Sequence, residues 1–488
     1  MLQLDCKDLI VTHAWIANER VASSDARTFT VENPADGTII AEVADCSAAE
    51  ARAAADAAHR AFACWRKLLA RERAAHLQAW LTLVRKNQED LAHLISLEQG
   101  KPLVESRGEV AYGAAYIEWF AEEAKRAYGD VIPETAPARK IIVTKEPVGV
   151  AAAITPWNFP IAMLARKIAP ALAAGCTVVA KPAEDTPLSA LALALLASEA
   201  GIPAGVINVV PASRRRAASV ADVWLKDQRV RKLSFTGSTA VGKHLAEASA
   251  PTLKRLSLEL GGNAPFIVFE DADLDQAVKG MIAAKFRNAG QTCICANRIY
   301  VADAIYDEFA ERAVEAVSKL RVGAAGEGEA EIGPLINARA LEKVERHVAN
   351  AVERGAQVLI GGKRHSLGRY FYEPTVLADV DSTMDLSCEE TFGPVAPLFR
   401  FKTEEEAITA ANSTPFGLAA YFYSRDIARV MRVSAAIESG MIGINEAAIS
   451  TEVAPFGGVK DSGYGREGSS YGIDEYLQTK YLCLGGLS

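Results

Sequence analysis

The chain lacks most features that mark secreted, membrane-spanning or nucleic-acid-binding proteins. Its eight cysteines in 488 residues are too sparse for a disulfide scaffold, and no C-x-x-C or Cys/His cluster predicts a metal site. The net charge of −8 argues against a partner with a phosphate backbone. No apolar run approaches the ~20 residues of a membrane span, and the N-terminus resembles neither a signal nor a transit peptide. We therefore expect a cytoplasmic protein that binds neither nucleic acid nor membranes.

What the chain has is an alternation of short apolar strands and helices. After a small N-terminal β segment and Ala-rich helices, this alternation begins near Gly149. The helices before it are predicted over 48–69, 71–100 and 103–128. The strands after it are predicted at 150–154, 177–180, 206–210, 232–235, 266–269, 299–301, 357–360 and 441–445. Such strands predict an α/β fold with a doubly wound parallel sheet, covered on both faces, of the kind that binds dinucleotides.

Two segments have the chemistry of a dinucleotide site. Phe235-Thr-Gly-Ser-Thr-Ala-Val-Gly242 follows a strand and opens a helix, where N–H groups and the helix dipole favour a phosphate. Its G-x-x-x-x-G spacing also fits a plain strand–helix turn, because it is neither G-x-G-x-x-G nor a P-loop. Lys181 and Glu184 follow another strand, where Lys181 would donate to ribose hydroxyls and Glu184 accept from them. The alternative is a solvated, charged loop.

Two further residues suggest catalysis. Glu259 lies within the apolar run Leu258-Glu-Leu-Gly-Gly262, where a carboxylate needs a purpose or a partner. It would serve as a general base for water, or else cap backbone N–H groups. Asn158, in the proline-bracketed loop 155–160, offers an N–H that would face an oxyanion, although Asn is also a common turn residue.

The segment Phe286-Arg-Asn-Ala-Gly-Gln-Thr-Cys-Ile-Cys-Ala-Asn-Arg298 holds two cysteines separated by one residue. A thiol among small and polar residues is a candidate nucleophile, redox partner or metal ligand. The alternative is a residue that only fills space in the core. Residues two apart in an extended chain lie about 6–7 Å between Cα atoms, at the upper edge of disulfide reach. A bridge between Cys293 and Cys295 would therefore be strained and easily reduced. The alternative is that Cys295 only fills space.

Taken in order, seven segments strongly resemble the NAD(P)-dependent aldehyde dehydrogenase superfamily, and the resemblance covers nearly the whole chain. They are Ile154–Pro160, Lys181–Pro187, Phe235–Gly242, Leu258–Gly262, Gly290–Cys295, Glu389–Pro394 and Pro455–Gly458. Within the superfamily, three stretches look like the succinate-semialdehyde dehydrogenases. These are Lys285–Arg298, Gly443–Ser450 and Tyr471–Tyr476.

The resemblance implies a mechanism. Cys293 would attack the aldehyde, Asn158 and the Cys293 N–H would hold the oxyanion, and Glu259 would activate water to release the thioester. NAD is expected over NADP, because a carboxylate at Glu184 repels a 2′-phosphate. The cofactor-binding residues implied are Pro156, Trp157, Lys181, Pro182, Ala183, Glu184, Gly237, Ser238, Gly242, Glu390 and Phe392.

The substrate subclass follows from three positions that match the carboxylate-binding residues of the subfamily: Arg166, Arg287 and Ser450. Two guanidiniums can bind one carboxylate bidentately, which implies succinate semialdehyde. The loop Glu446-Ala-Ala-Ile449 differs from some relatives, so glutarate semialdehyde stays open. The alternative is that Arg287 only braces its own loop.

The family fold implies three parts: an NAD-binding domain at 1–129 and 149–257, a catalytic domain at 258–460, and an oligomerisation extension at 130–148 and 470–488. Exposed edge strands need a partner, so we expect a homodimer or homotetramer. Two other readings compete with this one. A cofactor-free cysteine hydrolase would not need the dinucleotide segments, and a non-catalytic scaffold would not need Asn158, Glu259 and Cys293 together.

Overall fold

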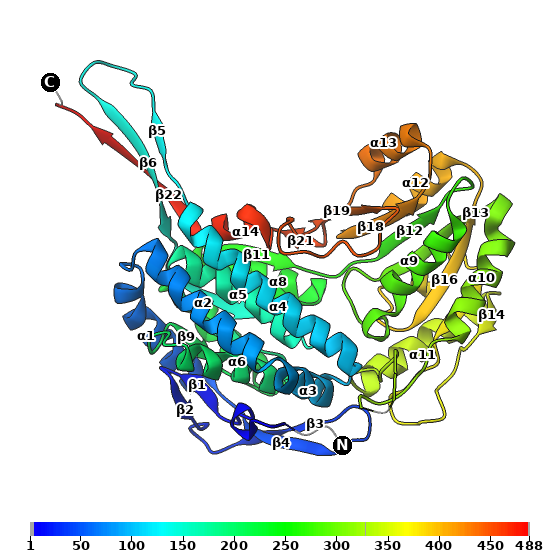
Figure 1. The fold of residues 1–488 in the computed structure, drawn as a ribbon, viewed down its shortest axis with the longest axis horizontal. Coiled ribbons are helices and arrows are strands. Elements are labelled where there is room, and N and C mark those ends of the chain that lie inside the picture. The colour runs from blue at the N-terminus through cyan, green and yellow to red at the C-terminus, as the bar shows by residue number, and fades with distance from the viewer. Residues whose placement is uncertain (1–3, 327, 487–488) are drawn as a thin grey trace.

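The computed structural model describes residues 4–326 and 328–486, which form two α/β lobes and a projecting β-arm (Figure 1). The first lobe is built on an eight-stranded sheet. Its order is β2 (Glu19–Val21), β1 (Ala14–Ile16), β9 (Ile207–Val209), β8 (Thr177–Lys181), β7 (Val150–Ile154), β10 (Val230–Thr236), β11 (Arg255–Glu259) and β21 (Gly463–Tyr464). The five strands from β9 to β11 run parallel, and the strands at both edges are antiparallel. The predicted parallel sheet is confirmed.

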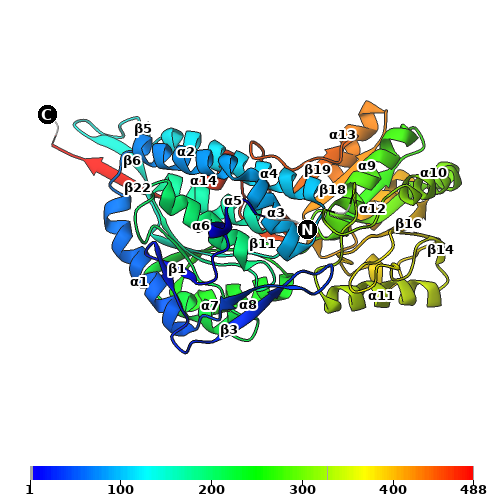
Figure 2. The same cartoon turned by 60° about the horizontal axis from the view of Figure 1, so that its bottom comes forward.

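Helices cover both faces of this sheet (Figure 2). On one face lie α2 (Ala70–Lys86), α3 (Gln88–Gln99), α4 (Leu103–Glu123), α5 (Pro160–Ala174) and α6 (Pro187–Glu199). On the other lie α1 (Ala48–Trp65), α7 (Ala217–Lys226) and α8 (Thr239–Ser249). Alternate residues of β7 join the two cores: Ala151 and Ala153 join the first, Val150 and Ala152 the second. This explains why β7 is apolar throughout.

The second lobe has a seven-stranded sheet. Its order is β14 (Gln357–Ile360), β15 (Thr375–Ala378), β16 (Val395–Phe401), β13 (Ala296–Ala302), β12 (Ala264–Val268), β18 (Ala419–Tyr423) and β19 (Met441–Ile444). Only β14 is antiparallel to its neighbour. Its helices are α9 (Leu274–Phe286), α10 (Tyr306–Ser318), α11 (Ala338–Glu353), α12 (Glu404–Asn412) and α13 (Ile427–Ala436). Phe266 and Val268 face one core and Ile267 the other, so this sheet is also covered on both faces.

The arm consists of β5 (Asp130–Ile132), β6 (Lys140–Pro147) and β22 (Leu477–Leu484), which pair antiparallel and extend away from both lobes (Figure 1). The helix α14 (Ser469–Asp474) leads into β22. Two small antiparallel pairs complete the fold: β3 (Thr28–Glu32) with β4 (Ile39–Ala44), and β17 (Phe416–Gly417) with β20 (Val459–Lys460). The predicted domain ranges stay a prediction, and their residues 1–3, 327, 487 and 488 lie outside the described chain.

Some elements differ from those predicted. The helix expected over 71–100 is two helices, because Asn87 (φ −100°, ψ 22°) leaves the helical conformation between α2 and α3. The sequence reading also missed α7 and β11, and β11 is the strand that ends at Glu259. Ser47 and Glu50 form a capping box at the start of α1. Within the described residues, no helix is both long and apolar enough to cross a membrane.

Candidate active site

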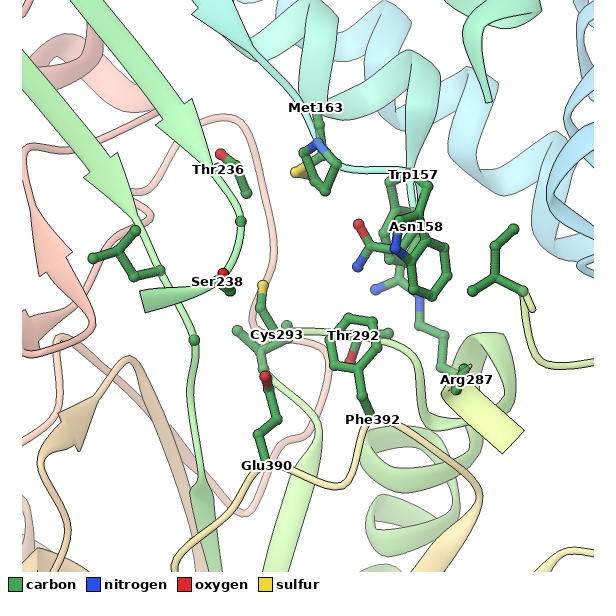
Figure 3. A pocket seen from close by; sticks show the side chains of 18 of the residues that line it. Trp157, Asn158, Met163, Thr236, Ser238, Arg287, Thr292, Cys293, Glu390 and Phe392 are labelled. Atoms are coloured by element: carbon green, nitrogen blue, oxygen red, sulfur yellow. The ribbon is translucent and has the colours of Figure 1, made fainter. Parts of the chain in front are cut away.

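A cavity of about 350 Å³ collects residues from both lobes (Figure 3). The loop after β7 and helix α5 contribute one wall, and the turn between β10 and α8 contributes another. The segment after α9 and the residues around Glu390 close the cavity from the second lobe. The predicted site residues that line it are Pro156, Trp157, Asn158, Arg166, Gly237, Ser238, Arg287, Cys293, Glu390, Phe392 and Ser450.

Cys293 stands on a turn whose backbone is unusual. Asn288, Ala289 and Gly290 have φ values of 51°, 54° and 74°, in the left-handed region. At Gly290 a Cβ would lie 2.1 Å from the main-chain oxygen of Gly393, so only glycine fits. The Gln291 side chain donates back to Asn288 O at 3.1 Å. Such strain persists only where the surroundings impose it, and it fixes the position of the thiol.

The Cys293 thiol is half-buried, and burial raises its pKa to about 12. The charge of Arg166 lowers this pKa, whereas Glu390 and Glu259 raise it further. At neutral pH the resting cysteine is therefore a neutral thiol, which must lose its proton to react.

Asn158 is buried between the two lobes. Its Nδ2 donates to the main-chain oxygen of Gln291 at 3.0 Å, two residues before Cys293. A side-chain amide carries two N–H bonds, so one of them is left for a negatively charged oxygen beside the thiol. In Figure 3 Asn158 and Cys293 both project into the cavity.

Glu259 is buried at the end of β11, and neither carboxylate oxygen has a hydrogen-bond partner among the described residues. Burial raises its pKa well above the usual value, and the nearby charge of Glu467 adds to this effect. Glu259 does not line the cavity in this conformation. It nevertheless lies close enough to Cys293 to raise the pKa of that thiol.

Glu467 is a site residue that the sequence analysis missed. Its carboxylate lies 2.6 Å from Arg166 Nη2 and 2.5 Å from Lys167 Nζ. Burial acts to raise the pKa of Glu467, but Arg166 and Lys167 outweigh it and hold the pKa below its usual value. Glu467 therefore forms the ion pairs with both buried cations, and their charges lower the pKa of Glu259 less than burial and Glu467 raise it.

The cofactor side of the cavity has the chemistry that a dinucleotide needs. Ser238 caps the N-terminus of α8, where a phosphate is favoured. Thr236 Oγ1 is buried without a partner, and Lys343 and Arg339 line the cavity without an ion pair to any described residue. Burial raises the pKa of the Glu390 carboxyl to about 7. These unpaired groups fit an anionic, hydroxyl-bearing ligand.

The other predicted cofactor residues lie outside this cavity: Lys181, Pro182, Ala183, Glu184 and Gly242. Glu184 lines an adjoining cavity of about 280 Å³ that shares Arg214 with the first. Lys181 Nζ lies 3.9 Å from Glu184 Oε2. Gly242 has a packing role, because a Cβ there would lie 2.3 Å from Leu260 Cδ2.

The two predicted carboxylate-binding arginines differ. Arg166 is 1% exposed, pairs with Glu467 and stacks on the Phe456 ring at 3.9 Å. Arg287 stacks on Phe159 at 4.9 Å and has no hydrogen bond or ion pair to a described residue. Arg287 therefore has its full hydrogen-bonding capacity free, whereas Arg166 has only part of it free. Ser450 lines the same cavity.

Cys295 is buried and does not line the cavity. Its Sγ donates to Lys285 O at 3.3 Å, and both Cys293 and Cys295 are free thiols. A bridge to Cys293 would break this bond, and the redox switch stays a prediction.

Comparison with known proteins identifies the family of this chain. Residues 21–482 match the aldehyde dehydrogenase family. The chain belongs to the aldehyde dehydrogenase family.

Three relatives resemble this aldehyde dehydrogenase over nearly their full length. A 3-sulfolactaldehyde dehydrogenase of Pseudomonas putida is 57% identical, with all of both chains covered. The NADP(+) succinate-semialdehyde dehydrogenase of Escherichia coli K12 is 56% identical, covering 99% of this chain and 100% of its own. A glutarate-semialdehyde dehydrogenase of Pseudomonas aeruginosa is 55% identical, with both chains fully covered.

Among solved structures, the succinate-semialdehyde dehydrogenase of Burkholderia pseudomallei superposes with a TM-score of 0.98 at 56% identity, over 99% of this chain and 100% of its own. The enzyme is thus an NAD(P)-dependent oxidoreductase with the aldehyde dehydrogenase fold. The cofactor-free hydrolase and the scaffold protein are set aside.

The raised pKa of Cys293 predicts how this aldehyde dehydrogenase reacts with iodoacetamide. Below the thiol pKa the thiolate fraction grows about tenfold per pH unit, so the inactivation rate of the free enzyme should climb from about pH 7 to about pH 10 without levelling off. Peptide mass mapping locates the alkylated residue, and Cys293→Ala is the control. A plateau below about pH 8 would mean that the thiol is activated at rest.

Proposed function

We propose that this aldehyde dehydrogenase oxidises succinate semialdehyde to succinate, with NAD preferred over NADP. The observation that carries the proposal is the unpaired guanidinium of Arg287 in the same cavity as the Cys293 thiol. A substrate with an aldehyde at one end and a carboxylate at the other satisfies both groups.

The described residues support the following sequence. The Cys293 sulfur bonds to the aldehyde carbon, and the thiol proton leaves to a base. The oxyanion accepts hydrogen bonds from the second N–H of Asn158 and from the Cys293 main chain. Ser238, Glu390 and Phe392 on the cofactor side would hold NAD(P), which would supply the hydride acceptor; loss of hydride from this carbon would leave a thioester on Cys293. Glu259 then removes a proton from water, which attacks the thioester and releases the carboxylate product and the thiol.

Glu259 suits a base that acts only when needed. Because its pKa is raised, the deprotonated carboxylate is a strong acceptor for a proton from water. Its two oxygens have no hydrogen-bond partner among the described residues. A rotation of this free side chain toward Cys293 would bring it to the cavity. Glu467, held between Arg166 and Lys167, lacks that freedom.

Relatives of similar identity act on three different aldehydes by name, and a direct comparison of substrates decides among them. Succinate semialdehyde, glutarate semialdehyde, 3-sulfolactaldehyde and butanal are each oxidised with NAD and with NADP while absorbance of the reduced cofactor is followed. The proposal expects the highest kcat/KM for succinate semialdehyde. A higher value for the longer carboxylate or for the sulfonate would replace the substrate and keep the family activity.

Arg287 tests recognition of the distal carboxylate. Arg287→Gln should raise KM for succinate semialdehyde about tenfold, because a charge-assisted hydrogen bond contributes about 1.5 kcal/mol. KM for butanal, which has the same length and no charge, should be unchanged. Arg339→Gln removes another unpaired cation of the cavity, on the cofactor side, and should leave the ratio of the two KM values as it is. Equal losses on both aldehydes in Arg287→Gln would indicate that Arg287 only braces its loop.

Glu184 tests the cofactor preference. A half-buried carboxylate accepts hydrogen bonds from ribose hydroxyls and repels a 2′-phosphate. Lys181 and Arg214, both near Glu184, act in the opposite direction. Glu184→Ser should raise the NADP:NAD ratio of kcat/KM by about tenfold, since one lost repulsion is worth about 1.4 kcal/mol. Asp185→Asn, which neutralises the neighbouring residue in the sequence, should shift this NADP:NAD ratio less. An enzyme that already uses both cofactors equally well would contradict the preference.

We also propose a homodimer or homotetramer assembled through the arm. Among the described residues, no further strand pairs with either edge of the three-stranded sheet β5–β6–β22, and Val131, Ile132 and Tyr481 on these edge strands are exposed. Such an edge invites pairing with another chain. Light scattering on the purified protein measures the assembly.

The cytoplasmic location stays a prediction.

A further inference from the structure

A buried ion pair lies directly beneath the loop that carries Asn158. Lys101 Nζ is 2.6 Å from Glu109 Oε2, and both side chains are completely inaccessible to solvent. Lys101 precedes α4, and Glu109 lies two turns into the helix. Burying two charges costs several kcal/mol per ion before their attraction is counted, so such a pair is a poor source of stability. Its presence calls for another reason.

Both members of the pair contact the Asn158 loop. Lys101 Nζ donates to the main-chain oxygen of Asn158 at 2.7 Å and stands 3.8 Å from the centre of the Phe159 ring. Glu109 Oε1 accepts from the N–H groups of Ile161 at 2.9 Å and Ala162 at 3.3 Å. These are N–H groups of the first turn of α5, which has no side-chain cap of its own. The pair therefore fixes the main chain at Asn158 and the start of the helix that follows it.

The N-terminal part of α4 also fixes the turn that carries Cys293, through Glu105. Glu105 lies one helical turn before Glu109 on α4, so the two carboxylates share a face. Burial raises the pKa of Glu105, and the charge of Lys101 acts on Glu105 as well and works to lower that pKa. Both Glu105 oxygens accept from Asn288 N, at 3.0 and 2.9 Å. Asn288 Nδ2 in turn donates to Asn158 O at 3.1 Å, beside the Lys101 bond. The oxygen of Asn158 thus receives two donors, one from each lobe.

We infer that Lys101 and Glu109 form a positioning unit that holds the Asn158 amide where the oxyanion develops. Neither residue lines the cavity, so both act through Asn158. The inference rests on the proposed function, because it takes Asn158 to be the oxyanion donor. Small displacements of such a donor cost rate rather than binding, because the hydrogen bond strengthens in the transition state.

A double-mutant cycle tests the inference. Lys101→Met with Glu109→Gln removes both charges together, keeps the side-chain volumes and leaves an oxygen to accept from Ile161 N. This pair of changes should lower kcat by about tenfold to a hundredfold, as expected for a misplaced catalytic group. KM for the aldehyde and the cofactor Kd, measured by tryptophan fluorescence, should change by less than about threefold. In the Asn158→Ala background the same changes should have almost no effect on kcat.

Two comparisons guard against a purely structural explanation. Lys232→Met with Glu475→Gln removes another ion pair with a buried lysine, 3.3 Å apart, and should lower Tm without lowering kcat. Glu109→Gln alone keeps the Lys101–Asn158 bond and should cost less activity than the pair of changes.

The possible failures are distinguishable. If the kcat loss is undiminished in the Asn158→Ala background, or if Lys101→Met with Glu109→Gln retains full kcat, the inference is overturned. If Asn158→Ala itself retains full kcat, the proposed role of Asn158 fails first.

Discussion

The hydrogen bond from Asn158 Nδ2 to the main-chain oxygen of Gln291 joins the two lobes two residues before the Cys293 thiol, the proposed nucleophile. Asn158 follows β7 of the first sheet, whereas Gln291 belongs to the turn that presents Cys293 from the second lobe. Neither lobe holds both the thiol and the amide, so the proposed reaction depends on how the lobes are joined. The backbone strain at Asn288 and Ala289 and the buried charges of α4 serve this junction.

The distribution of buried charge explains why two neighbouring carboxyl groups behave differently. Glu467 receives both Arg166 and Lys167, so its pKa is lowered against the effect of burial. Glu259 forms an ion pair with neither Arg166 nor Lys167, and burial together with the charge of Glu467 raises its pKa. One carboxylate is thereby a fixed counter-ion, and the other is the group that we propose as proton acceptor. Paired acidic groups whose environments push their pKa values apart are a recurring basis for acid–base roles.

The sequence predicted the elements whose signal is local. The all-apolar strand 150–154 predicted β7, and the isolated carboxylate in Leu258-Glu-Leu-Gly-Gly262 predicted that Glu259 is buried. The break at Asn87 was missed, because the apolar pattern continues through it. The family resemblance supplied the roles of Asn158, Glu259 and Cys293, and the structure adds that Glu259 lies behind the cavity wall rather than in it.

The supporting residues could not be predicted, because their partners are distant in the chain. Lys101 and Asn158 are 57 residues apart, and Lys167 and Glu467 are 300 residues apart. In the sequence Lys101 and Glu109 look like ordinary charges at the start of a helix. Only the packing of α4 against α5 turns them into a buried pair.

In the proposed mechanism a thioester forms on Cys293, and water activated by Glu259 hydrolyses it. The most direct measurement uses Glu259→Gln mixed with succinate semialdehyde and NAD, quenched in acid and digested for peptide mass analysis. The account predicts a burst of NADH matched by an equal amount of the peptide containing Cys293 that carries one succinyl group. A burst without that adduct, or an adduct on Cys295 instead, would contradict it.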